Sequence, residues 1–432
     1  MSGPSSTAGS STRILLVSDF YPPLIGGATR FAQLLAHELV RCGYEVVVAT
    51  AWQPGTAIEE HDELGVAVHR LHGLTMRLPG LSANPYRRIP PPFPDPELVW
   101  RFRRLLRREQ PDIVHSFGWL SYSCAVALLG SDTPLILNAQ DYGYVCALGT
   151  LFQHGRTICS GPAARKCLAC ATDHHGAAKG ALAVLGVLGG RRLLRRKLRA
   201  VQSVSHYVRD VLREHLLNAQ SERLTDGSSI IEAVIPDFRV ETDARSDETI
   251  LARLPREPFI LFVGALREVK GIRVLLAAYE RLVDPPPLVL IGTRAPDMPT
   301  VFPPGVTVEH EVPNATVMAA WDRALFGVAP SCWPEPLGIV VHEAMSRGRA
   351  VIGTRPGGHA EMIEPDVDGL LVDAGDAEGL AAAMRRLISD GALRARLEQA
   401  AKAHSELFTA EALMPQVDSL IGEVLLRSRK GT

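Results

Sequence analysis

The chain has 432 residues, of which 46% are hydrophobic and 22% are charged, and its formal net charge is −1. This length suits two or three domains with sizeable cores, and the balanced charge excludes a global field that attracts nucleic acid. No apolar run approaches the roughly 18 residues that span a membrane. The tail at residues 1–12 is rich in Ser and Gly and lacks the pattern of a signal peptide, so we expect a cytoplasmic protein.

Strand and helix patterns alternate through the first half of the chain. Apolar strands are expected at residues 13–18, 45–50, 112–117, 134–138 and 200–204, and a helix at 28–42. This alternation predicts a Rossmann-like domain over residues 13–238. Gly26 and Gly27 stand in the loop after the first strand, where the absence of a side chain would let a ligand approach the backbone. A plain turn is the alternative.

Four cysteines occur in an insertion at residues 145–175. Cys146, Cys159, Cys167 and Cys170 have the spacing C-x12-C-x7-C-x2-C. Four thiolates this close in sequence are enough for a tetrahedral site, so the hypothesis is one structural metal ion, with zinc first. An iron–sulfur cluster and free thiols are the alternatives, because the second C-x2-C pair of a strong zinc motif is absent.

An apolar segment and a basic segment follow the insertion. Residues 180–190 are apolar with several glycines, and residues 191–199 contain six basic side chains. Together they could make a peripheral contact with an anionic membrane through residues 180–199. We favour the alternative, an ordinary helix with a solvated basic face, because glycines weaken a helix. Residues 239–257 are polar and charged, as expected of a linker between domains.

The second half of the chain repeats the alternation. Strands are expected at residues 258–264, 287–292 and 306–311, and a strand–helix–strand unit at 325–352. Residues 258–408 are therefore predicted to form a second Rossmann-like domain, followed by a closing helix and tail at 409–432.

The strand–helix–strand unit contains several candidate ligand-binding groups close together in the sequence. The loop PEPLG leads into the helix IVVHEAMS, and the free N–H groups at such a helix start favour an anion. Glu335 precedes the helix and Glu343 lies within it. Because these carboxylates would repel a phosphate, uncharged hydroxyls are their natural partners. A ligand that combines phosphates with many hydroxyls is a nucleotide sugar.

The same stretch resembles a known enzyme family. Glu335 and Glu343 are separated by seven residues, and the pattern continues with Ala344, Met345, Gly348, Val351, Gly357, Gly358 and Glu361. It resembles the E-x7-E signature of the retaining glycosyltransferases of group 1, or family 4. The resemblance implies the GT-B fold, an α/β architecture of two Rossmann-like domains that face a cleft. It also implies transfer of a sugar from a UDP- or GDP-linked donor to an acceptor hydroxyl, with retention of configuration and no required cofactor.

Donor contacts follow from the resemblance. Glu335 corresponds to the residue that contacts the sugar hydroxyls, and Glu343 to the one that takes the ribose hydroxyls. The amides near Leu337 and Gly338 suit the diphosphate, and Gly26 with Gly27 matches the family's glycine loop at the cleft.

The segment that begins at Gly264 resembles the family's V-G-R-L-x3-K-G. Lys270 matches the lysine that contacts the donor diphosphate. The arginine position holds Ala265, and Arg267 stands two residues further on. We therefore expect Lys270 to bind the diphosphate and name Arg267 as a candidate for the missing arginine.

A second departure lies at the end of the fourth expected strand. Many family members read T-x-H-D where this chain has Asn138-Ala139-Gln140-Asp141. Gln140 can position a hydroxyl but cannot act as a base. We name Glu335, Lys270 and Gln140 as the candidate catalytic residues. An inactive relative that serves as a binding partner, and a sugar-nucleotide epimerase or phosphorylase, are the alternative functions.

Overall fold

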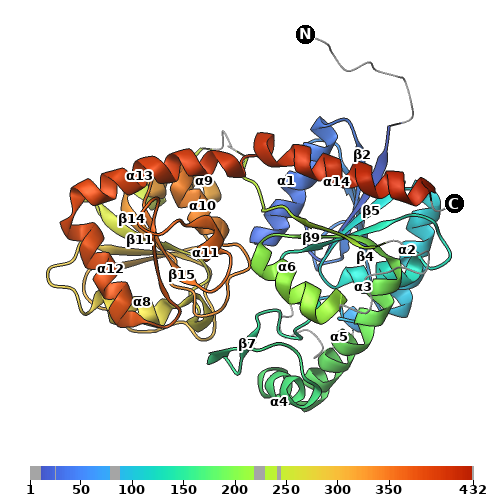
Figure 1. Ribbon diagram of the computed structural model, residues 1–432, viewed down its shortest axis with the longest axis horizontal. Helices are drawn as coiled ribbons and strands as arrows, with labels where there is room; N and C mark the ends of the chain where they lie inside the picture. Colours follow the sequence, from blue (N-terminus) through green and yellow to red (C-terminus); the bar gives the residue numbers. More distant parts are fainter. Residues whose placement is uncertain (1–10, 25, 78–87, 218–228, 241–244, 431–432) are drawn as a thin grey trace, which may run out of the picture.

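The computed structural model describes residues 11–24, 26–77, 88–217, 229–240 and 245–430. They form two α/β domains side by side, and helix α14 (Ala410–Lys430) runs back from the second domain across the first (Figure 1). Most of the expected N-terminal tail, residues 1–10, and residues 241–244 of the expected linker lie outside the described residues.

The first domain is built on a sheet of strand order β10-β9-β6-β5-β1-β2-β4-β3, in which only β3 and β4 pair antiparallel. Its strands are β1 (Arg13–Ser18), β2 (Glu45–Ala51), β3 (Glu59–His61), β4 (Ala67–Leu71), β5 (Ile113–Phe117), β6 (Leu135–Ala139), β9 (Leu198–Ser203) and β10 (Ile231–Val234). The central strands are buried along nearly their whole length, which explains the continuous apolar runs in the sequence.

Helices cover this sheet. They are α1 (Gly27–Arg41), α2 (Pro96–Glu109), α3 (Leu120–Ala127) and α6 (His206–Leu212), with a 3-10 turn at Thr75–Arg77 and a π turn at Arg213–Leu217. Asp95 caps α2 by accepting hydrogen bonds from the backbone N–H groups of Glu97 and Leu98, at 2.9 and 3.2 Å.

The second domain is built on a fully parallel sheet of order β13-β12-β11-β14-β15-β16. Its strands are β11 (Phe259–Val263), β12 (Leu288–Gly292), β13 (Val306–His310), β14 (Ala324–Val328), β15 (Val351–Arg355) and β16 (Leu370–Asp373). Its helices are α7 (Glu248–Leu251), α8 (Ile272–Tyr279), α9 (Asn314–Arg323), α10 (Ile339–Ser346), α11 (His359–Met362), α12 (Ala377–Ser389) and α13 (Gly391–Ser405), with 3-10 turns at Glu268–Lys270 and Glu406–Phe408.

The expected strands all form, within two residues of the predicted ends except for β15, which runs three residues further than 352, to Arg355. Two local predictions need correction. The end of the expected linker is helix α7, which packs on α9 because Leu251 and Leu254 are buried. The basic segment does not stay helical to Arg199, because β9 begins at Leu198 and pairs with β6.

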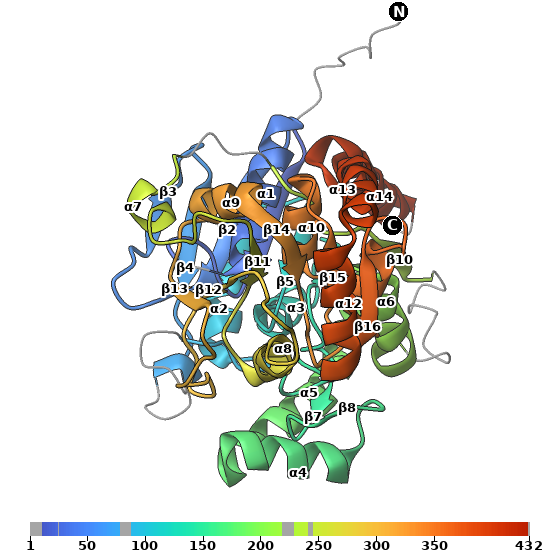
Figure 2. The same ribbon diagram turned by 90° about the vertical axis from the view of Figure 1, so that its left-hand side faces the viewer.

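The insertion projects from the first domain with the short strands β7 (Phe152–Gln153) and β8 (Thr157–Ile158) and helix α4 (Ala164–His175), which forms a hairpin with the following helix α5 (Ala177–Lys197) (Figure 2). Gly180 packs against the α4 backbone at Ala171, and Gly190 packs against the ring of Tyr122. These glycines therefore serve close packing inside the protein. The proposed membrane contact stays a hypothesis, carried by exposed side chains such as Leu185. None of the helices in the described ranges has the length and apolar character needed to cross a bilayer.

Helix α14 joins the two domains. Val417, Ile421 and Val424 are buried in a core that also includes side chains of both sheets. The hydroxyl of Tyr44, which directly precedes β2, donates a hydrogen bond to the Asp418 carboxylate of α14. The C-terminal helix α14 thus connects the second domain to the first.

Candidate active site

The structure brings Lys270 and Glu335 into direct contact. Lys270 ends the turn after β11, and Glu335 lies in the loop between β14 and α10. The Lys270 ammonium donates to Glu335 Oε1 at 2.7 Å. The two loops are joined nearby, where the Cys332 N–H donates to the Val269 carbonyl at 2.9 Å. Loops at the carboxyl ends of parallel strands are where open α/β sheets bind ligands.

The Glu335 carboxylate accepts hydrogen bonds from three side chains, which leaves capacity for a further donor. Ser331 Oγ and Trp333 Nε1 donate to its Oε2 at 2.7 and 2.8 Å, and the Trp333 ring also lies under the Lys270 ammonium, 5.2 Å from its centroid. Burial alone would raise the pKa of Glu335, but the Lys270 charge and these hydrogen bonds hold it below its ordinary value. Glu335 is therefore an anion in a fixed orientation.

The start of helix α10 lies beside this pair, and glycines shape it. Gly338, the N-cap, has φ +97°, and a side chain on it would collide with the His359 ring. Gly357 and Gly358 cross the Glu335 loop so closely that a Cβ on either would lie within 3 Å of its backbone, and the Gly358 N–H donates to the Glu335 carbonyl at 2.6 Å. The paired glycines thus set the backbone at the helix start.

Glu343 lies one turn into α10 and faces the other domain. Asn314 Nδ2 donates to its Oε1 at 2.9 Å, and the guanidinium of Arg30, from α1 of the first domain, lies 3.8 Å from the same oxygen. Burial raises the pKa of Glu343. The Arg30 charge and the hydrogen bond from Asn314 oppose that shift.

Several segments of the first domain contact this region of the second domain. A Cβ on Gly27, at the start of α1, would lie 3.6 Å from Ile339 at the start of α10. The Tyr142 hydroxyl donates to the Pro334 carbonyl at 2.8 Å. The Glu361 carboxylate accepts from the first N–H groups of α6, those of His206 and Tyr207, at 2.7 Å each.

Gln140 follows β6, two residues before Tyr142. Its Nε2 donates to Asn138 Oδ1 at 2.9 Å and to Asp237 Oδ1 at 2.8 Å. Asn138 and Asp237 are buried, whereas Gln140 is only partly buried. Burial raises the pKa of Asp237 to about 7, and the hydrogen bond from Gln140 opposes that shift.

The other predicted donor-site residues lie at the edge of this group. Gly264 directly follows β11 and Gly26 precedes α1, while Leu337 is buried against Gly358. The Arg267 guanidinium lies 3.5 Å from the Asp297 carboxylate and is 45% exposed. A direct role for Arg267 at the diphosphate therefore stays a prediction.

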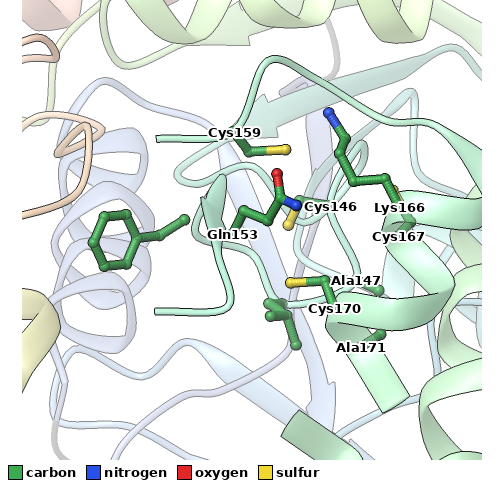
Figure 3. A pocket seen from close by; sticks show the side chains of 10 residues that line it. Cys146, Ala147, Gln153, Cys159, Lys166, Cys167, Cys170 and Ala171 are labelled. Carbon is green, nitrogen blue, oxygen red and sulfur yellow. The ribbon is translucent and has the colours of Figure 1, made fainter. Parts of the chain in front are cut away.

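The predicted cysteines line one pocket in the insertion. In Figure 3 the sulfurs of Cys146, Cys159 and Cys170 point toward the space between β8 and α4. Within the described ranges, no three ligand-type side chains are yet close enough to hold a metal ion. Burial raises the pKa of the Cys167 and Cys170 thiols.

Several residues of the site carry no motif that the sequence reading used. Asp19 caps α3 by accepting from the N–H groups of Trp119 and Leu120 at 2.8 and 2.7 Å. His359 is buried beside Gly338, and burial lowers its pKa to about 4. The position of Asp19 after β1 and that of His359 after two glycines were the available signals.

Comparison with known proteins agrees with this geometry. Residues 26–225 match the model of the glycosyl transferase 4-like domain, and residues 245–404 match that of the glycosyl transferases group 1. A D-inositol 3-phosphate glycosyltransferase of Arthrobacter sp. (strain FB24) is 26% identical over 89% of this chain and 86% of that protein. A glycogen synthase of Mycobacterium tuberculosis (strain ATCC 25618 / H37Rv) is also 26% identical, over 97% of this chain and 95% of that protein.

Solved structures show the same fold. Sucrose-phosphate synthase from Thermosynechococcus elongatus superposes with a TM-score of 0.69 at 20% identity, covering 96% of this chain and 100% of that one. The Anabaena protein HepE in complex with UDP and glucose has a TM-score of 0.65 at 15% identity, covering 95% of this chain and 100% of that one. The two domain models and the shared architecture place the chain in the group 1 family, as a glycosyltransferase with the GT-B fold.

Proposed function

We propose that this glycosyltransferase moves a sugar from a UDP- or GDP-linked donor to an acceptor hydroxyl, with retention of anomeric configuration. The observation that carries the proposal is the Lys270–Glu335 pair beside the start of α10. One cation, free helix N–H groups and oriented carboxylates together match the phosphates and hydroxyls of a nucleotide sugar. The HepE complex with UDP and glucose supports the nucleotide-sugar class, and the E-x7-E resemblance supports retention.

The proposed roles follow the charges. Departure of a nucleoside diphosphate builds negative charge on the leaving oxygen, which Lys270 and the amides near Gly338 would stabilise. Glu343, next to Asn314, would accept from the ribose hydroxyls. Glu335 would accept from the sugar hydroxyls, because its fixed carboxylate has a depressed pKa. Side chains and amides would neutralise the diphosphate, so no metal is part of this mechanism.

The test begins with binding. A panel of UDP- and GDP-sugars is screened by thermal shift, because a donor at 100 times its Kd stabilises the fold by roughly 2.7 kcal/mol. The selected donor is then incubated with simple sugar alcohols and hexose acceptors, and the anomeric configuration of the product is read by NMR. An inverted product would refute retention, and stabilisation without any nucleotide release would point to an inactive binding protein. Interconversion of the donor sugar without transfer would point to an epimerase.

A further inference from the structure

The side chain of Gln140 is held by two acceptors from separate parts of the first domain. Asn138 belongs to β6, and Asp237 follows β10, which lies two strands away in the sheet. Parallel strands bring these chain ends to the same edge of the sheet, although Asp237 is 97 residues from Gln140. The contact is thus a product of the fold, and nothing in the local sequence around Gln140 specifies it.

These two contacts fix the direction of the Gln140 amide. An NH2 group has two protons, and the bonds to Asn138 and Asp237 use both of them. In the opposite orientation, Oε1 would face two acceptor oxygens and the amide would lose both bonds. Asn138 Nδ2 lies 3.5 Å from His115 Nε2 on the other side, and it donates there when the His115 proton is on Nδ1, which keeps the Asn138 oxygen toward Gln140.

The remaining atom of the amide, Oε1, is left for a ligand. No side chain or backbone group of the described residues donates to it, and it is not among the buried atoms without a partner, so it reaches solvent. Two residues on, Tyr142 touches the loop that carries Glu335. Oε1 is therefore an available hydrogen-bond acceptor, in a segment that contacts the Glu335 loop.

We propose that Asp237 is a positioning residue of the donor-sugar pocket, which together with Asn138 turns Gln140 Oε1 toward the sugar. The inference rests on the proposed function. A pocket with a fixed hydrogen-bond acceptor favours a sugar whose hydroxyl can donate to it. It disfavours a sugar that has only a hydrogen-bond acceptor, such as a fluorine, at the same position. Asp237 thus sets which donor is preferred without touching the donor itself.

The test uses the full chain with UDP-glucose and GDP-mannose. It measures hydrolysis of the donor, in which water takes the place of the acceptor and UDP or GDP is released. Asp237→Val removes the acceptor atom, and Asp237→Asn keeps one as the matched control. We expect Asp237→Val to lower kcat by about 10- to 100-fold with the Kd for UDP or GDP unchanged, and Asp237→Asn to stay within about threefold of the wild type. In a Gln140→Ala background, Asp237→Val should have little further effect, because Asp237 acts through Gln140.

A separate readout does not depend on turnover. The Gln140 side-chain amide, followed by NMR with selectively 15N-labelled glutamine, should exchange slowly with water in the wild type and Asp237→Asn, and rapidly in Asp237→Val. Equal exchange in Asp237→Val, or additive losses in the double variant, would overturn the positioning role. Wild-type protein that binds and cleaves neither donor, but shows the protected amide, would instead count against the proposed function.

Discussion

Replacing Lys270 by Met removes the positive charge that pairs with Glu335. In the structure this ammonium makes a 2.7 Å bond to Glu335 Oε1, and the two side chains are 30% and 10% exposed. Met retains the length and apolar stem of lysine, so it preserves the contact with the Trp333 ring. Ser331 and Trp333 still donate to the other carboxylate oxygen. The substitution therefore isolates the loss of charge.

Two magnitudes follow from this geometry. Losing a cation placed at the developing charge of the leaving diphosphate should lower kcat by about 10²- to 10³-fold. Stability should fall by about 1–3 kcal/mol, less than for a fully buried pair, because Lys270 is partly exposed and two hydrogen bonds to Glu335 remain. Lys270→Arg, the control, retains the charge and should lose less on both counts.

The loss of stability in Lys270→Met should depend on pH. The folded-state pKa of Glu335 is depressed in the wild type, so its stabilising contribution is present at neutral pH and is lost as the pH falls through the folded-state pKa. Lys270→Met removes most of that depression. The stability difference between wild type and variant, measured by urea unfolding, should therefore be largest at pH 7 and should shrink on acidification below the ordinary glutamate pKa. A variant with kcat/KM within threefold of the wild type and a pH-independent difference would refute the role of the pair.

Three further predictions concern other residues. Glu343→Ala should raise the donor Kd with little change in kcat, whereas Glu335→Ala should chiefly lower kcat; unchanged kcat/KM in both variants, measured by steady-state kinetics, would contradict the E-x7-E assignment. Asp237→Asn should stabilise the fold more at pH 8 than at pH 5, because a carboxyl with a raised folded-state pKa lowers stability progressively as the pH rises from the ordinary aspartate pKa to about 7; equal unfolding midpoints of variant and wild type at pH 8 would count against this. We also expect about one equivalent of zinc in elemental analysis of protein purified without added metal, and loss of that zinc in Cys167→Ser/Cys170→Ser; freely titrating thiols with less than about a tenth of an equivalent of metal would sink the hypothesis.

The local parts of the site could be predicted from the sequence because they depend on neighbours in the chain. Two apolar runs and a helical repeat of apolar residues over residues 324–355 predict strands β14 and β15 with α10 between them. The glycines after β15 are required by the close crossing of the Glu335 loop, so the motif and the geometry coincide. The proximity of Lys270 and Glu335 also follows, since both lie in loops that leave parallel strands at the same edge of the sheet.

The pairings that cross the domains could not be predicted, because no periodicity or spacing encodes a contact between residues far apart in the chain. Tyr142 and Pro334 are 192 residues apart, and His206 and Glu361 are 155 apart. Gln140 illustrates the consequence. The sequence showed that an amide stands where a histidine is common in the family, which raised the question of an inactive relative. Only the buried Asp237 shows how such an amide is held in a single orientation, and a held amide is one that can take part in binding a sugar. We therefore propose that the replacement changes which sugar the pocket recognises, and we expect substitutions at this position to alter the preferred donor more than the presence of activity.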